Sequence, residues 1–182
     1  TPSPKVYLAA ADSQPDTATK KYTAFTSGTA LADYIRSIPT PHLYELVYDT
    51  HDYPCYMYFD MDRQTPYTVT HEIYQQIITR FQHILSSFLC DIYHTPNITF
   101  ILGHNMQVAY TQSPNKISLH IKVNIIFPNL QYMQTFVKNL DKYMCSNKYI
   151  TPEDRSLFYS YENDKYTPLI DHSVYSNFRS YR

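Results

Sequence analysis

The segment from Lys116 to Phe127 constrains the fold more than any other part of the sequence, because its apolar and polar residues alternate almost without interruption. A β-strand turns successive side chains to opposite faces, so the alternation predicts a strand with one apolar and one polar face. The apolar positions are Ile117, Leu119, Ile121, Val123 and Ile125. The polar positions begin with Lys116, Ser118, His120 and Lys122. Such a strand requires partner strands and a layer that covers its apolar face.

Helices that can form this layer are predicted at residues 29–38, 71–90 and 130–144. Thr70 is placed to cap the second of them. Further strands are predicted at residues 42–48, 55–62 and 97–102. The first two of these strands are expected to form a hairpin, and residues 146–168 are expected to be mostly loop. The order of elements predicts an α+β fold, with a mixed or antiparallel sheet and flanking helices.

The length of 182 residues predicts a single domain with its own hydrophobic core. Residues 1–24, rich in Pro, Ser, Thr and Ala, are predicted to be a weakly ordered N-terminal segment. Residues 25–182 form the predicted core. No apolar run approaches the length of a membrane span, so we expect a soluble intracellular protein without a membrane partner.

The composition excludes several kinds of binding site. The chain has only two glycines, which excludes the glycine-rich phosphate loops of P-loop and Rossmann proteins. Any bound phosphate must therefore be held by side chains and metal. The three cysteines lack C-x-x-C spacing, which argues against a zinc knuckle and favours a reducing compartment. A net charge of −1 gives no overall attraction to nucleic acid, so any basic surface is local.

Two acids lie two residues apart in the predicted strand at 55–62. Asp60 and Asp62 would share one face, while Phe59 and Met61 would point to the other. Two carboxylates this close can share divalent cations, and Mg²⁺ and Mn²⁺ prefer such hard oxygen ligands. Taken alone, the pair is more often two solvent-exposed acids at a strand end.

The polar face of the strand at 116–127 suits a polyphosphate. Lys116 supplies a cation, and Ser118 and His120 supply hydrogen-bond donors at a spacing of about 6–7 Å along the strand. The alternative is an ordinary amphipathic strand whose polar face meets solvent.

A third group of candidate residues lies near the end of the chain. Asp171 follows the apolar pair Leu169-Ile170, so a strand could hold it near the same metals as the first two acids. Arg179 and Arg182 carry the planar charge that suits phosphate oxygens. The alternative is a charged terminus without a binding role. His172 is expected to be a surface histidine.

Together these segments resemble the motifs of the archaeo-eukaryotic primase (AEP) superfamily. The similar features are Tyr-Phe-Asp-x-Asp ending at Asp62, Ser-x-His ending at His120, and an apolar residue before Asp171 with Val-Tyr shortly after it. The resemblance is closest to primase-polymerases and to primases of large nucleocytoplasmic DNA viruses and herpesviruses. It extends to Tyr44-Glu45, Cys55, Lys116 and Tyr181-Arg182. The chain departs from the family where relatives carry Asn-Arg-Asn and it has Phe178-Arg179-Ser180.

This resemblance implies an RRM-like primase catalytic core and a DNA-templated nucleotidyltransferase that makes or extends primers. Two Mg²⁺ or Mn²⁺ ions would be held by Asp60, Asp62 and Asp171. The triphosphate would be bound by Lys116, Ser118, His120 and Arg182, or by Arg179 in place of Arg182. Implied partners are single-stranded DNA, NTPs or dNTPs, and a helicase region or subunit. The resemblance also implies a fragment of a longer protein and, for a viral protein, a location at the replication site or in the nucleus.

Two other functions remain open. The first is a catalytically inactive primase-fold module that binds nucleic acid. The second is a metal-dependent nuclease that uses the same acids. The row of Lys116, Ser118 and His120 favours synthesis over cleavage, because a nuclease has no triphosphate to bind.

Overall fold

The computed structural model describes residues 7–12, 20–37, 43–46, 53–95, 102–103, 106–146, 151–162, 164–175 and 180–181. The chain divides into two compact units. The smaller unit combines Thr1–Tyr48 with Asn177–Arg182, and the larger unit is Asp49–Ser176. The predicted boundary at residue 25 does not coincide with this division. No helix in the described ranges combines the length and apolar character needed to cross a membrane.

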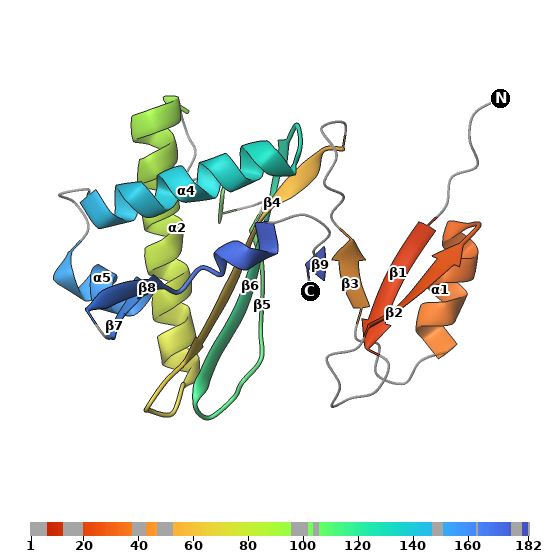
Figure 1. Ribbon diagram of the computed structural model, residues 1–182, viewed down its shortest axis with the longest axis horizontal. Helices are drawn as coiled ribbons and strands as arrows, with labels where there is room; N and C mark the ends of the chain where they lie inside the picture. The colour runs from red at the N-terminus through yellow and green to blue at the C-terminus, as the bar shows by residue number, and fades with distance from the viewer. Residues whose placement is uncertain are drawn as a thin grey trace. The chain divides into compact units, whose positions relative to one another are not determined.

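The smaller unit contains an antiparallel sheet with the strand order β2-β1-β3-β9. Its strands are β1 (Tyr7–Asp12), β2 (Lys20–Phe25), β3 (Leu43–Leu46) and β9 (Ser180–Tyr181). Helix α1 (Gly28–Ser37) lies beside β1 and β2 (Figure 1). Strand β1 and most of β2 lie in the segment predicted to be weakly ordered. The two strands form there because each supplies backbone hydrogen-bond partners to the other.

The larger unit is built on an antiparallel sheet with the strand order β4-β6-β5. Its strands are β4 (Cys55–Gln64), β5 (Met106–Tyr110) and β6 (Lys116–Phe127), and β6 has the predicted bounds. The predicted hairpin of residues 42–48 with 55–62 is wrong, because β3 pairs with β1 and β9 whereas β4 pairs with β6. Strand β5 was not predicted. It lies at the edge of the sheet and has only five residues, of which the three central ones are exposed.

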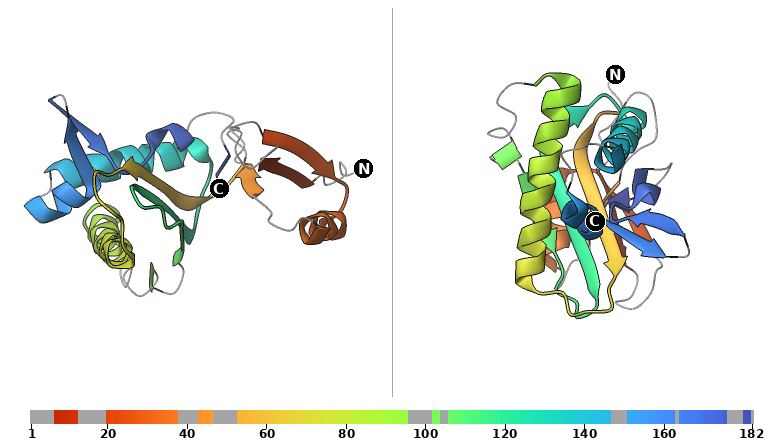
Figure 2. Two further views of the ribbon diagram at one scale, coloured as in Figure 1. Left: turned by 90° about the horizontal axis from the view of Figure 1, so that it is seen from below. Right: turned by 90° about the vertical axis from the view of Figure 1, so that its left-hand side faces the viewer.

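Helices α2 (His71–Tyr93) and α4 (Leu130–Ser146) cover the apolar face of this sheet. Figures 1 and 2 show α4 running across α2. Phe59 of β4 meets Phe81 of α2 edge to face, with ring centroids 4.7 Å apart. The core of this face includes Met57, Phe59, Met61, Ile117, Leu119, Ile121, Val123, Ile77, Phe81, Leu85, Met133 and Leu140, all of which are buried. Thr70 occupies the N-cap position of α2, but its side chain makes no capping bond.

The segment predicted to be mostly loop contains regular structure, so that prediction is wrong. It forms α5 (Pro152–Phe158) and a hairpin of β7 (Tyr159–Glu162) with β8 (Lys165–Pro168). Thr151 and Asp154 cap α5 reciprocally, and Pro152 begins the helix with a favourable backbone angle. Arg80 of α2 donates to both carboxylate oxygens of Asp154, which fixes α5 against α2.

After β8 the chain runs along β4 and forms a short 3₁₀ helix, η1 (His172–Tyr175). The predicted strand at 97–102 lies largely outside the described residues. The fold class is therefore α+β with antiparallel sheets, as predicted.

Candidate functional site

Pairing between β4 and β6 brings the first two acids opposite the Ser-x-His segment. Asp60 lies opposite His120, and Asp62 lies opposite Ser118. Directly opposed residues of an antiparallel pair project to the same face of the sheet. Phe59 and Met61 are fully buried on the other face, as the alternation predicted.

Asp171 joins this face from the outer edge of β4. Ile170 forms a β-bridge with Met61. The Asp171 amide donates to the Asp60 carbonyl at 2.8 Å, and the Asp62 amide donates to the Leu169 carbonyl at 3.1 Å. This antiparallel pattern places Asp171 opposite Asp60, so both side chains start from the same face. The structure thus brings together the backbone positions of the three predicted acids.

Two basic side chains contact the acids of β4. The Lys116 Nζ lies 2.8 Å from Oδ2 of Asp62. The His120 Nε2 lies 3.3 Å from Oδ1 of Asp60. This Asp60 oxygen is buried and accepts no hydrogen bond from the described residues. The His120 imidazole lies beside this oxygen without hydrogen-bond geometry, so a bound cation would stabilise the oxygen further.

The Asp171 carboxylate is engaged by the start of η1. It accepts hydrogen bonds from the Ser173 amide at 2.8 Å and from the Ser173 hydroxyl at 3.0 Å. In the part of the chain that the structure describes, no three His, Cys, Asp or Glu side chains are arranged to hold a metal ion. Each carboxylate oxygen has two lone pairs, so the contacts with Lys116, His120 and Ser173 leave these acids further acceptor capacity. The donor set fits a hard divalent cation, although the three carboxylates are not preassembled around one point.

Two tyrosines hold η1 against β4 beside Asp60. The Tyr58 hydroxyl donates to the Val174 carbonyl at 3.1 Å, and the Tyr175 hydroxyl donates to the Tyr58 carbonyl at 2.9 Å. Their rings stack with centroids 5.1 Å apart. These contacts fix the backbone that follows Asp171. Sequence reasoning did not assign Tyr58 a role, because its partners lie more than a hundred residues away.

His172 is less exposed than the sequence predicted. Its side chain is 33% exposed, and its Nε2 lies 3.7 Å from Oδ2 of Asp141 on α4. The other Asp141 oxygen accepts a hydrogen bond of 2.5 Å from the Tyr159 hydroxyl. Burial and the neighbouring Asp141 carboxylate raise the pKa of Tyr159, so this hydroxyl stays protonated. Asp141 thus links α4 with β7 and with the residue after Asp171.

The two predicted arginine ligands, Arg179 and Arg182, lie outside the described residues. Tyr181, which precedes Arg182, pairs with Glu45 in the sheet of the smaller unit. Tyr44 pairs with Ala10 in the same sheet.

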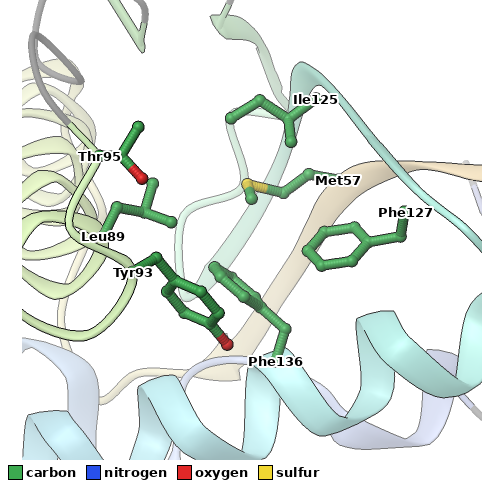
Figure 3. A pocket seen from close by; sticks show the side chains of 7 residues that line it. All are labelled: Met57, Leu89, Tyr93, Thr95, Ile125, Phe127 and Phe136. Carbon is green, nitrogen blue, oxygen red and sulfur yellow. The ribbon is translucent and has the colours of Figure 1, made fainter.

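A cavity of about 350 Å³ opens on the apolar side of the larger unit (Figure 3). Its lining is Met57, Leu89, Tyr93, Thr95, Ile125, Phe127 and Phe136, and none of these is a predicted site residue. Met57 belongs to the face of β4 that carries Phe59 and Met61. The cavity is therefore separate from the acid face of the sheet.

Comparison with models of known protein families gives no match. Comparison with curated protein sequences gives none either.

Proposed function

We propose that this chain is a DNA-templated nucleotidyltransferase, a primase or primase-polymerase whose RRM-like core is the β4-β6-β5 sheet with its helices. The observation that carries the proposal is the register of β4. On one side of β4, strand β6 sets Ser118 opposite Asp62 and His120 opposite Asp60. On the other side, the segment around Ile170 sets Asp171 opposite Asp60. Three segments far apart in the sequence thus supply acids and phosphate-binding groups to one face.

The acids and the polar row have complementary roles in this proposal. Asp60, Asp62 and Asp171 would hold two divalent cations. When bound, such cations activate a primer 3′ hydroxyl and stabilise the charge that develops on the pyrophosphate leaving group. Lys116 supplies a cation to the triphosphate, while Ser118 and His120 donate hydrogen bonds to its oxygens. The contact between Lys116 and Asp62 supports this proposal, because it shows that the row of Lys116, Ser118 and His120 begins beside the acids.

The proposed substrates are NTPs or dNTPs with single-stranded DNA as the template, and a helicase region or subunit is a proposed partner. The test is incubation of the chain with a single-stranded template, labelled nucleotides and Mn²⁺. We expect labelled oligomers that depend on the template. The variant Asp60→Asn with Asp62→Asn should lower incorporation at least about a hundredfold, because removal of a group that stabilises transition-state charge costs this much in other enzymes.

Asp164→Asn is the matched control. Asp164 is an exposed acid at the turn of the β7-β8 hairpin, and its φ of 60° suits Asn equally well. The control should retain full incorporation. An active double variant, or equal losses in both variants, would remove Asp60 and Asp62 from the mechanism.

A catalytically inactive nucleic-acid-binding module is the second candidate. The engagement of the Asp171 carboxylate by Ser173 favours it, since these acids are not preassembled as a metal site. The same incubation separates the candidates. Template binding without product indicates the inactive module, and a shortened template indicates a nuclease.

A further inference from the structure

A second row of side chains crosses the polar face of the sheet beside the acids. Lys122 follows His120 by two residues on β6, so their side chains share a face and start about 7 Å apart. The Lys122 Nζ lies 4.5 Å from the centroid of the Tyr56 ring. Gln107 of β5 is directly opposite Lys122. The row of Tyr56, Lys122 and Gln107 therefore combines an aromatic ring, a cation and an amide from three adjacent strands.

This row is accessible from solvent. The Tyr56 side chain is 38% exposed despite its contact with Lys122, and Gln107 is exposed. The β4-β6 register shifts between Tyr56 and Met57, and such irregularities re-aim the side chains beside them. Ala109, opposite His120, is also exposed and carries only a methyl group. The His120 side chain is only 15% exposed, so the open part of this surface lies over Gln107 and Ala109.

We propose that Tyr56, Lys122 and Gln107 bind single-stranded DNA and guide it toward the acid face. A base would stack on Tyr56, a backbone phosphate would pair with Lys122, and Gln107 would hydrogen-bond a base edge or sugar. Aromatic rings beside cations are the usual means of binding single strands without a fixed sequence. Lys122 continues the row of Lys116, Ser118 and His120 along β6. A DNA strand bound at Lys122 would therefore lead directly to His120. This inference deepens the proposed function. It rests on that function only where it identifies the bound DNA strand as the template.

Fluorescence anisotropy with a labelled single-stranded DNA oligonucleotide tests the inference on the full chain, without metal or nucleotide. Tyr56→Leu should weaken binding about tenfold, the effect of losing one stacked base. Lys122→Met should reduce the slope of log affinity against log salt by about 0.7, the effect of losing one phosphate contact to a single strand.

Two residues of α4 provide matched controls. Tyr132 is 60% exposed and Lys138 is exposed, so Tyr132→Leu and Lys138→Met remove the same side-chain types elsewhere on this unit. Both controls should keep the affinity and salt slope of the unmodified chain. Tyr56→Phe retains the ring face and should also retain affinity. Circular dichroism checks that each variant is folded. If Tyr56→Leu is unfolded, Tyr56→Phe still tests the inference, because tenfold weaker binding by folded Tyr56→Phe would contradict stacking.

The outcomes separate this inference from the proposed function. Unchanged strand affinity and salt slope in folded Tyr56→Leu and Lys122→Met would overturn the inference, even if the chain extends primers. Equal losses in the α4 controls would also overturn it. Specific losses in a chain that incorporates no nucleotide would support strand binding and contradict the proposed activity.

Discussion

Asp60 is flanked by His120 of β6 and by Asp171 on the other side of β4. Its side chain is 16% exposed, and its buried Oδ1 accepts no hydrogen bond from the described residues. Asp171 lies opposite it, and Asp62 shares its face of β4. Like charges in such proximity destabilise each other unless a counter-ion intervenes. The sequence predicted the face of Asp60 but not its burial, which depends on η1 and on contacts from distant segments.

Lys116→Met tests the phosphate-binding row at the scale of one residue. We expect the KM for nucleotide to rise about tenfold or more, because a charge-assisted contact to phosphate is lost. Stability should change by less than about 1 kcal/mol, since the pair with Asp62 is more than a third exposed and is screened by solvent. Initial rates over a range of nucleotide concentrations and urea unfolding measure the two effects. An unchanged KM, with Lys138→Met as the control, would contradict the assigned role of Lys116.

Among the elements, α5 begins with a helix-start signal that is present in the sequence. Thr151 and Asp154 form a capping box that is visible in the sequence, and Pro152 marks a helix start. The polar and tyrosine-rich residues around it favour the loop prediction instead. By contrast, β7 and β8 have four residues each, and Lys165, Tyr166 and Thr167 of β8 are all exposed, so the hairpin offers only a weak periodic signal. Its formation depends on pairing that a one-dimensional pattern does not reveal.

The link between α5 and α2 should make stability depend on pH. Hydrogen bonds from Arg80 lower the pKa of Asp154, whose side chain is only 3% exposed. A lowered folded-state pKa stabilises the fold above the unfolded value of about 3.9, and this contribution is lost as pH falls through the folded value. Asp154→Asn should therefore lower the free energy of unfolding by about 1–3 kcal/mol at neutral pH. The difference from the unmodified chain should shrink below a pH of about 4.

Urea unfolding of both proteins across this pH range measures the effect. Asn keeps one acceptor oxygen for the Thr151 amide, but its amide nitrogen cannot accept the second bond from Arg80, so the substitution removes the charge together with one of the paired bonds. A difference that stays constant from neutral to acidic pH would show that the Arg80 contact does not stabilise through charge.

Tyr175→Phe tests whether η1 positions Asp171. Loss of this buried hydroxyl leaves the Tyr58 carbonyl without that donor and should cost about 1–2 kcal/mol. We also expect the kcat for incorporation to fall, with little change in the KM for nucleotide. Tyr166→Phe is the control, because Tyr166 is 64% exposed. Full activity in a destabilised Tyr175→Phe protein would show that the position of η1 does not affect catalysis.

At the scale of the whole molecule, the sequence predicted the α+β class. It also predicted those helices and strands of the larger unit whose apolar residues repeat regularly. Strand β6 and helices α2 and α4 were recognised because their apolar residues repeat at the strand or helix period. The division into two units was not predicted, because the smaller unit joins the two ends of the chain. The pairing of β3 with β9 depends on contacts between segments more than a hundred residues apart.

The proposed activity requires Asp60, Asp62 and Asp171 to share metal ions opposite the row of Lys116, Ser118 and His120. A crystal structure of the chain with Mn²⁺ and a non-hydrolysable nucleoside triphosphate tests this directly. We predict anomalous density for Mn²⁺ contacting carboxylates of all three acids, with the triphosphate lying against Ser118 and His120. Mn²⁺ bound elsewhere, or a triphosphate away from β6, would contradict the account.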